Sequence, residues 1–272
     1  MPNDIAPELL ERIQEIFDGK IKGNHTITAI TRKIEKGERL DYREANKFAE
    51  AVGDALAAAF KRCLSPQELP DGKMYYNIAD RVVRPMLVGN YSLIADVAEY
   101  TQKSLNKAAG INLAAQRPKI NESRVQGLVD KVSSYDDYAE AAWVLDEPVV
   151  NFSQSVVDEF IKSNVEFQYN AGFQPLIERI LDTGCCQWCA NIAKNSPFKY
   201  PDDVPDDLYR RHDFCRCTVI FEPSKGKREG AHTKRDYANT HEAEIEERKA
   251  NLERDAKKRK QKQEAKAKAL KS

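Results

Sequence analysis

The chain has 272 residues, of which 41% are hydrophobic and 32% are charged. This length allows one large domain or two small ones, and the composition is typical of a helix-rich protein with exposed charged faces. The longest apolar stretch, residues 55–60, is far shorter than the roughly 20 residues of a membrane span, so no membrane association is expected. The N-terminus also lacks the basic start and apolar core of a signal peptide. We therefore expect that the protein is made in the cytoplasm. It then either stays there or is enclosed in a particle assembled there.

The charges are unevenly distributed along the chain. Lys and Arg total 43, as do Asp and Glu, but residues 225–272 carry 16 basic against 9 acidic side chains, a local balance of +7. The rest of the chain is correspondingly acidic. This asymmetry predicts an acidic body with a basic tail, which could contact nucleic acid or an acidic surface.

Residues 1–172 have the pattern of successive amphipathic helices. Pro7 opens the first, which Gly19 is expected to end, and Asp41 is the predicted N-cap of a long second helix. Further helices are predicted over residues 74–87, 92–109, 121–132, 135–145 and 151–171, with breaks at Gly89-Asn90 and Glu147-Pro148 and an end at Gly172. The prediction is an α-helical body.

The pattern changes after Gly172. Residues 176–181 and 218–221 are predicted strands, and a loop rich in Pro and Asp (residues 200–207) lies between them. Residues 225–272 contain too few apolar side chains for a packed face, which predicts an exposed helix or disorder. The expected fold class is therefore mainly α. It comprises a helical body (1–172), a small zinc-binding α+β module (173–224) and a charged tail (225–272).

The cysteines are clustered. Cys63 stands alone in a helical stretch and is predicted to be a small buried hydrophobic residue. The other five lie within one 33-residue window: Cys185, Cys186, Cys189, Cys215 and Cys217. In a reducing cytoplasm such a cluster more often binds metal or does redox chemistry than forms structural disulfides.

The spacing of these residues favours zinc. A structural zinc site takes four ligands, commonly as two short pairs from separate turns. Cys186-x-x-Cys189 is one such pair and His212-x-x-Cys215 is the second, while Cys217 and Cys185 are possible alternates. We therefore predict a Cys3His zinc site. The neighbouring arginines could offset the thiolate charge: Arg210, Arg211 and Arg216.

Three other interpretations remain open. Cys186-x-x-Cys189 could be a thioredoxin-like redox motif, but that motif belongs at a strand-to-helix turn in a βαβ context, which the helical region upstream does not indicate. The cysteines could form a disulfide-stapled module, although five cannot all pair. A catalytic zinc would need an open position and a general base, for which Asp207 and Asp213 are the nearby carboxylates. No catalytic residue is predicted, and we expect a structural protein.

At these residues the chain resembles a known family. Residues 164–172 (Asn-Val-Glu-Phe-Gln-Tyr-Asn-Ala-Gly), 185–189 (Cys-Cys-Gln-Trp-Cys) and 209–219 (Tyr-Arg-Arg-His-Asp-Phe-Cys-Arg-Cys-Thr-Val) are similar to minor head, or head-morphogenesis, proteins of tailed phages and prophages, particularly those of Gram-positive bacteria. The match spans roughly residues 154–223. One departure is Phe214, where some relatives carry Asn or Pro.

The resemblance implies a low-copy minor capsid protein in the capsid interior, associated with the portal protein and acting in head assembly or in DNA packaging and ejection. Its expected location is the virion, and the host cytoplasm during assembly. The basic tail could then contact packaged DNA weakly, through Lys257, Lys258, Arg259, Lys260 and Lys262. The alternatives are a zinc-dependent nuclease or toxin-type effector and a zinc-dependent DNA-binding protein. The apolar-poor tail does not favour the first, and the absence of a compact basic helix does not favour the second.

Overall fold

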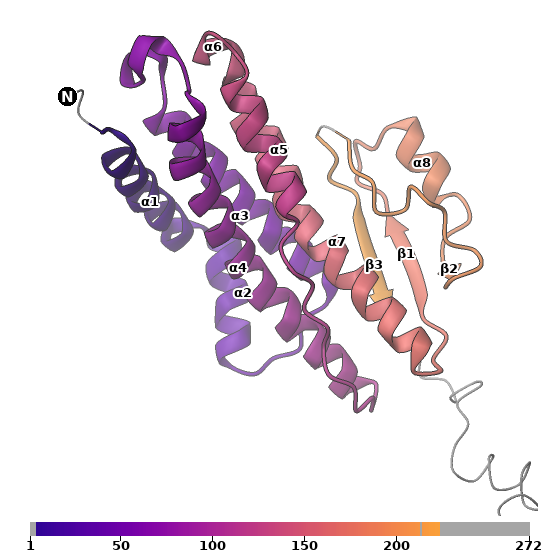
Figure 1. Cartoon of the computed structure of the whole chain (residues 1–272). Helices are drawn as coiled ribbons and strands as arrows, with labels where there is room; N and C mark the ends of the chain where they lie inside the picture. Colours follow the sequence, from indigo (N-terminus) through magenta and orange to yellow (C-terminus); the bar gives the residue numbers. More distant parts are fainter. Residues whose placement is uncertain (1–3, 213, 224–272) are drawn as a thin grey trace, which may run out of the picture. The chain divides into compact units, whose positions relative to one another are not determined.

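The computed structural model describes residues 4–212 and 214–223 (Figure 1). The predictions for the tail, including its five candidate DNA-contacting side chains, lie outside these residues. Within them the chain is mainly helical with a small antiparallel sheet, as expected. Among the described residues, no helix combines the length and apolar character that crossing a membrane requires.

The helices of the body precede the sheet in the chain. They are α1 (Ala6–Gly23), α2 (His25–Glu35), α3 (Tyr42–Cys63), α4 (Tyr76–Ala108), α5 (Glu122–Ser133), α6 (Tyr138–Ala141) and α7 (Glu147–Asn170), with short 3-10 turns η1 (Pro66–Glu68), η2 (Pro70–Gly72) and η3 (Ala142–Leu145). Helices α3, α4 and α7 contact one another and contribute most of the buried apolar side chains. Cys63 is 1% exposed, which confirms that it is a core residue.

Two predicted helix ends are confirmed by their capping contacts. The Asp41 carboxylate accepts a hydrogen bond from the Glu44 backbone N–H (2.9 Å), and the Glu44 carboxylate accepts one from the Asp41 N–H (3.2 Å). This reciprocal capping box starts α3. Helix α7 ends before Gly172, whose φ of +85° is the left-handed conformation that glycine adopts without strain.

Other predicted boundaries were wrong. Helix α1 continues through Gly19 to Gly23, and α4 runs unbroken across Gly89 and Asn90. At both places tertiary packing outweighs the low helix propensity of these residues. Ile21, beyond Gly19, packs against the core. Buried Asn90 accepts a hydrogen bond from Ser153 of α7 (3.0 Å). The break predicted at Glu147-Pro148 lies at Asp146 instead, and α7 already begins at Glu147. Pro148 does not interrupt α7. It lies in the first turn of α7, where its missing N–H has no intrahelical partner to lose. The helix predicted over residues 135–145 is only α6 followed by η3.

Three strands form the sheet, in the order β2-β1-β3. The two predicted strands are confirmed as β1 (Leu176–Ile180) and β3 (Thr218–Glu222), which pair antiparallel. The sequence did not indicate the two-residue β2 (Phe198–Lys199) or the seven-residue helix α8 (Gln187–Ala193). Both are too short to carry a recognisable apolar period.

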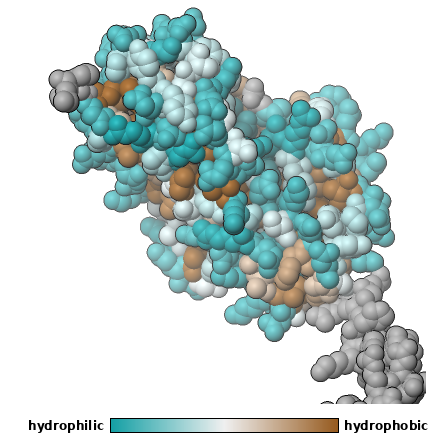
Figure 2. All heavy atoms as spheres, viewed as in Figure 1, coloured by the Kyte–Doolittle hydropathy of each residue, from teal (hydrophilic) through white to brown (hydrophobic). Residues whose placement is uncertain are grey.

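The sheet packs against α3 and α7 (Figure 1). Ile177, Val219 and Phe221 are at most 2% exposed and belong to the same apolar cluster as the helices. The Phe221 ring lies 6.2 Å from that of Tyr42 at the start of α3. The core therefore continues across residue 172, where only the type of secondary structure changes. On the face shown in Figure 2 hydrophilic residues predominate, with apolar patches between them.

Gly53 lies at a close approach of α3 to α7. A Cβ atom there would lie 2.8 Å from Ser153 Oγ and 2.9 Å from Val150 Cα. We predict that Gly53→Ala lowers the free energy of unfolding by about 1–3 kcal/mol, because the two backbones must separate. Chemical denaturation measures this. The matched control is Gly19→Ala in α1, where a Cβ would meet nothing within 4 Å and should stabilise the helix by up to about 1 kcal/mol. Equal changes in the free energy of unfolding for the two substitutions would contradict a close approach of α3 to α7 at Gly53.

Candidate metal centre

Strand pairing brings two distant cysteine-containing segments together. The first segment follows β1, with Cys186 as the N-cap of α8 and Cys189 in its first turn. The second precedes β3 and contains His212, Cys215 and Cys217. Because β1 and β3 are antiparallel, with Ile180 opposite Thr218, the chain leaving β1 lies next to the chain entering β3. The sulfur and imidazole groups of both segments therefore meet at one end of the sheet.

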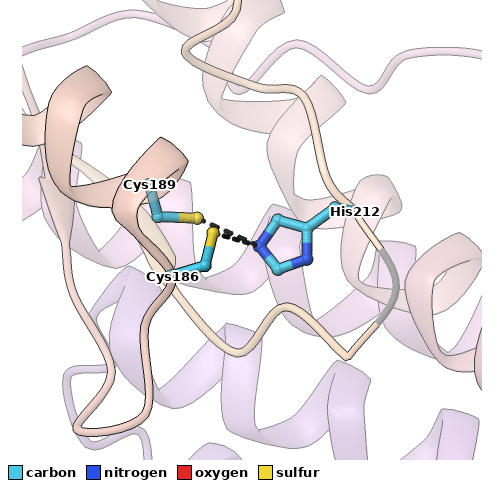
Figure 3. Close-up of side chains that lie close together, drawn as sticks. All are labelled: Cys186, Cys189 and His212. Carbon is cyan, nitrogen blue, oxygen red and sulfur yellow. Dashed lines mark hydrogen bonds between the residues drawn. The ribbon is translucent and has the colours of Figure 1, made fainter.

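The side chains converge closely. His212 Nε2 lies 3.3 Å from Cys186 Sγ and 3.3 Å from Cys189 Sγ (Figure 3). Cys189 Sγ in turn lies 3.8 Å from Cys215 Sγ. Two groups of three donors result, one of Cys186, Cys189 and His212 and one of Cys189, Cys215 and Cys217, each with its donor atoms within 4.8 Å of one another. These clusters could hold a metal ion, and Cys189 is common to both.

The four predicted ligands are thus neighbours, although the structure does not place them in one group. Cys215 is close to Cys189, which belongs to both groups. Cys215 and Cys217 are buried to the same extent, each 2% exposed. The second predicted alternate, Cys185, is half-buried and packs against the buried thiols with Trp188. The structure therefore brings together all six candidate metal-binding residues.

The arginines expected to balance the thiolates are paired elsewhere. Arg210 is exposed and lies 3.4 Å from Asp207. Arg216 forms ion pairs with Glu50 (2.8 Å) and Glu147 (2.5 Å). Arg211 pairs with a carboxylate of α7, described below. Carboxylates of the helical body therefore compete for Arg211 and Arg216. The buried Arg211 guanidinium still lies close enough to Cys215 and Cys217 for their charges to interact, so the expected offset of thiolate charge is supported for this arginine.

Arg179 contacts the sulfurs instead. It lies in β1 and is 3% exposed. Its Nη2 donates to Cys189 Sγ (3.4 Å) and Cys215 Sγ (3.5 Å), its Nη1 donates to the Leu208 carbonyl, and its guanidinium lies 5.7 Å from the Trp188 ring centre. Sequence reasoning missed this residue. The available signal was strand alternation, which puts Arg179 on the same face as buried Ile177.

The thiols differ in acidity. Burial raises the pKa of Cys189 to about 12, with the Arg179 guanidinium opposing the shift. Burial also raises the pKa of Cys217. In contrast, hydrogen bonding from the Cys189 backbone N–H lowers the pKa of Cys186. A metal ion binding here must therefore displace protons from the inner sulfurs, which is the normal cost of thiolate coordination.

Arg211 connects the centre to the helical body. Its guanidinium donates to both carboxylate oxygens of Asp158 in α7 (2.6 and 2.9 Å), and these side chains are 2% and 3% exposed. It also donates to Asn46 Oδ1 of α3 (3.2 Å) and to the Cys217 carbonyl (2.9 Å). One side chain therefore fixes the segment between His212 and Cys217 against two helices.

Comparison of the chain with protein-family models, with curated proteins and with solved structures returns no match.

The Arg211–Asp158 pair predicts a large stability effect. Asp158→Ala leaves a guanidinium buried without its counter-ion, so we expect the free energy of unfolding to fall by about 3–5 kcal/mol in chemical denaturation. The control is Asp96→Ala, because the Asp96 carboxylate also lies 2.6 Å from an arginine, Arg117, but is 69% exposed. Its loss should cost less than about 1 kcal/mol. Similar small losses for both variants would show that the buried pair does not anchor the segment.

Proposed function

We propose that the centre is a structural zinc site with Cys186, Cys189, His212 and Cys215 as ligands. Tetrahedral zinc, with Zn–S of about 2.3 Å and Zn–N of about 2.0 Å, separates two sulfurs by about 3.8 Å and sulfur from nitrogen by about 3.5 Å. The Cys189–Cys215 and Cys–His212 separations of 3.8 and 3.3 Å agree with these values. Not all four donor atoms lie within 4.8 Å of one another, so a zinc ion would also have to draw Cys215 towards Cys186 and His212. A mixed set of thiolates and imidazole also suits zinc better than it suits the hard cations.

Arg179 supports Cys215 in place of Cys217 as the third thiolate beside Cys186 and Cys189, because it donates a hydrogen bond to Cys215 Sγ. Three thiolates around Zn²⁺ leave one negative charge, which the buried guanidinium balances. The N–H groups of Arg179 point to Cys189 and Cys215, and hydrogen bonds of this kind are typical of the groups that orient metal ligands. Cys217 then remains a neighbouring thiol. The ion would tie the start of α8 to the segment before β3.

We predict about one zinc per chain in the purified full-length protein, measured by elemental analysis. Cys186→Ser, Cys189→Ser and Cys215→Ser should each lose most of the metal, because three ligands hold zinc far less well than four. Cys63→Ser, in the helical core, is the matched control and should keep the metal, and Cys185→Ser should have a mild effect. Equal losses from Cys185→Ser and Cys186→Ser would mean that the ligand pair is shifted by one residue.

We further propose that the protein is a minor capsid protein of a tailed phage or prophage, acting in head assembly and in DNA packaging or ejection. The order of elements supports this: a strand, a Cys pair, a Pro-containing loop, then His-x-x-Cys-x-Cys and a closing strand, with the thiols and imidazole gathered in one centre. That order is the one on which the resemblance to head-morphogenesis proteins rests. In this proposal the module stiffens a protein that contacts the portal inside the capsid.

Capsids purified from a culture that produces particles test this proposal. Quantitative mass spectrometry should find the protein at a few copies for each portal, and chemical cross-linking should join it to the portal protein. Full-length protein expressed in the same culture but absent from the capsids would refute the assignment.

We also propose that the basic tail binds duplex DNA without sequence preference. Residues 254–271 contain nine basic side chains and two acidic ones, and neutralising phosphates with them releases counterions. Retardation of duplex DNA in gels should therefore weaken steeply as salt rises, and truncation after Thr240 should abolish it while leaving the zinc content unchanged. Equal binding by the truncated protein would move any DNA contact to residues 1–240.

A further inference from the structure

Cys186 and Cys189 differ in accessibility although their sulfurs are neighbours. Cys186 is exposed, whereas Cys189 is completely buried. Both sulfurs lie within 4.8 Å of each other and 3.3 Å from the same His212 nitrogen. Figure 3 shows the two thiols side by side at the start of α8, facing the imidazole. A small oxidant arriving from solvent therefore meets Cys186 first and finds a second thiol directly behind it.

The backbone around this pair shares one feature with dithiol redox sites, a turn from a strand into a helix. The pair follows strand β1 and occupies the N-cap and first turn of α8. A strand-to-helix turn is the setting in which Cys-x-x-Cys motifs undergo reversible oxidation, and the sequence pattern alone did not indicate it here. The next element is an antiparallel strand, so the resemblance stops at the turn itself.

We propose that Cys186 and Cys189 form an oxidation site, at which a hydroperoxide produces an intrachain disulfide and expels the metal ion. The release of metal rests on the zinc centre proposed above, whereas formation of the disulfide depends only on the two thiols. The site would make the module responsive to the change from a reducing cytoplasm to oxidising surroundings.

The chemistry has two steps. The Cys186 thiolate attacks hydrogen peroxide, the O–O bond breaks, hydroxide leaves, and the sulfur is oxidised to a sulfenic acid. The Cys189 sulfur then attacks the Cys186 sulfur, the S–O bond breaks, and a second hydroxide leaves as the disulfide forms. In the zinc-loaded protein both sulfurs start as thiolates, so the two hydroxides take up two protons from solvent. Overall, two thiolates, one peroxide and two protons give one disulfide and two waters, and the zinc ion would be released.

The consequences follow from the ligand count. Oxidation of Cys186 and Cys189 removes two of the four proposed ligands, which leaves His212 and Cys215 to hold the ion. Two donors do not retain zinc against a chelator. The disulfide lies within one segment, so it cannot replace the connection between α8 and the chain before β3. Oxidation should therefore loosen the two segments, and reduction with zinc should restore them.

The test uses purified full-length protein whose metal content has been measured first. A few molar equivalents of hydrogen peroxide are added in the presence of a chromogenic zinc chelator. We expect zinc release to keep pace with the loss of two thiols per chain, and non-reducing peptide mapping to find Cys186 joined to Cys189. The control Cys63→Ser, in the helical core, retains the pair and every candidate ligand, and it should behave like the unsubstituted protein.

A second variant tests the point of entry. Cys186→Ala removes the exposed thiol, so buried Cys189 should remain reduced at the same peroxide dose, read by mass spectrometry with circular dichroism confirming the fold. Disulfides between other cysteines, equally fast oxidation of Cys189 in Cys186→Ala, or zinc release with both thiols intact would overturn the proposal. Untreated protein without metal would refute the zinc centre alone, because the disulfide map still tests the thiol pair.

Discussion

The antiparallel pairing of β1 with β3 is the constraint on which the rest of the module depends. The two strands are separated by 37 residues of chain that contain only short elements, so local structure alone could not bring Cys186 and Cys189 to His212 and Cys215. Backbone hydrogen bonds between the strands do this, and burial of Ile177, Val219 and Phe221 against α3 and α7 fixes which face of the sheet turns inward. The same register aligns the exit of β1 with the entry to β3, where the candidate metal-binding groups meet.

Two buried arginines place positive charge in this module, one next to the thiols and one next to a carboxylate of the helical body. Arg179 donates to the sulfurs from within the sheet, and Arg211 pairs with Asp158 of the helical body. Each guanidinium would be costly to bury alone, and each gains hydrogen bonds that only the folded chain supplies. The first provides positive charge next to the thiols. The second joins the segment carrying His212 and Cys217 to α3 and α7.

The proposals for zinc, for oxidation and for a role in the capsid depend on different observations. Zinc rests on the donor set and its separations, and oxidation rests on one exposed thiol beside one buried thiol. The capsid assignment rests on the order of elements around the centre. The first two are consistent with each other because a thiolate site that stabilises a protein inside a reducing cell is also a site that oxidants can open. Such a response would suit a protein that leaves the cell in a particle.

The sequence by itself determined the helical class, the two longer strands, the cap at Asp41 and the helix end at Gly172. It also identified the Cys and His residues that the fold brings together. These features depend on short-range patterns: the apolar period, capping chemistry and ligand spacing. Only the tertiary structure decided that α4 runs through Gly89 and Asn90, because Ser153, the partner of Asn90, lies 63 residues away in sequence. Likewise, only the fold assigned Arg179 to the sulfurs and Arg211 to Asp158. Arginines near a cysteine cluster look equivalent in sequence, and their partners are chosen by which strand and helix faces are buried together.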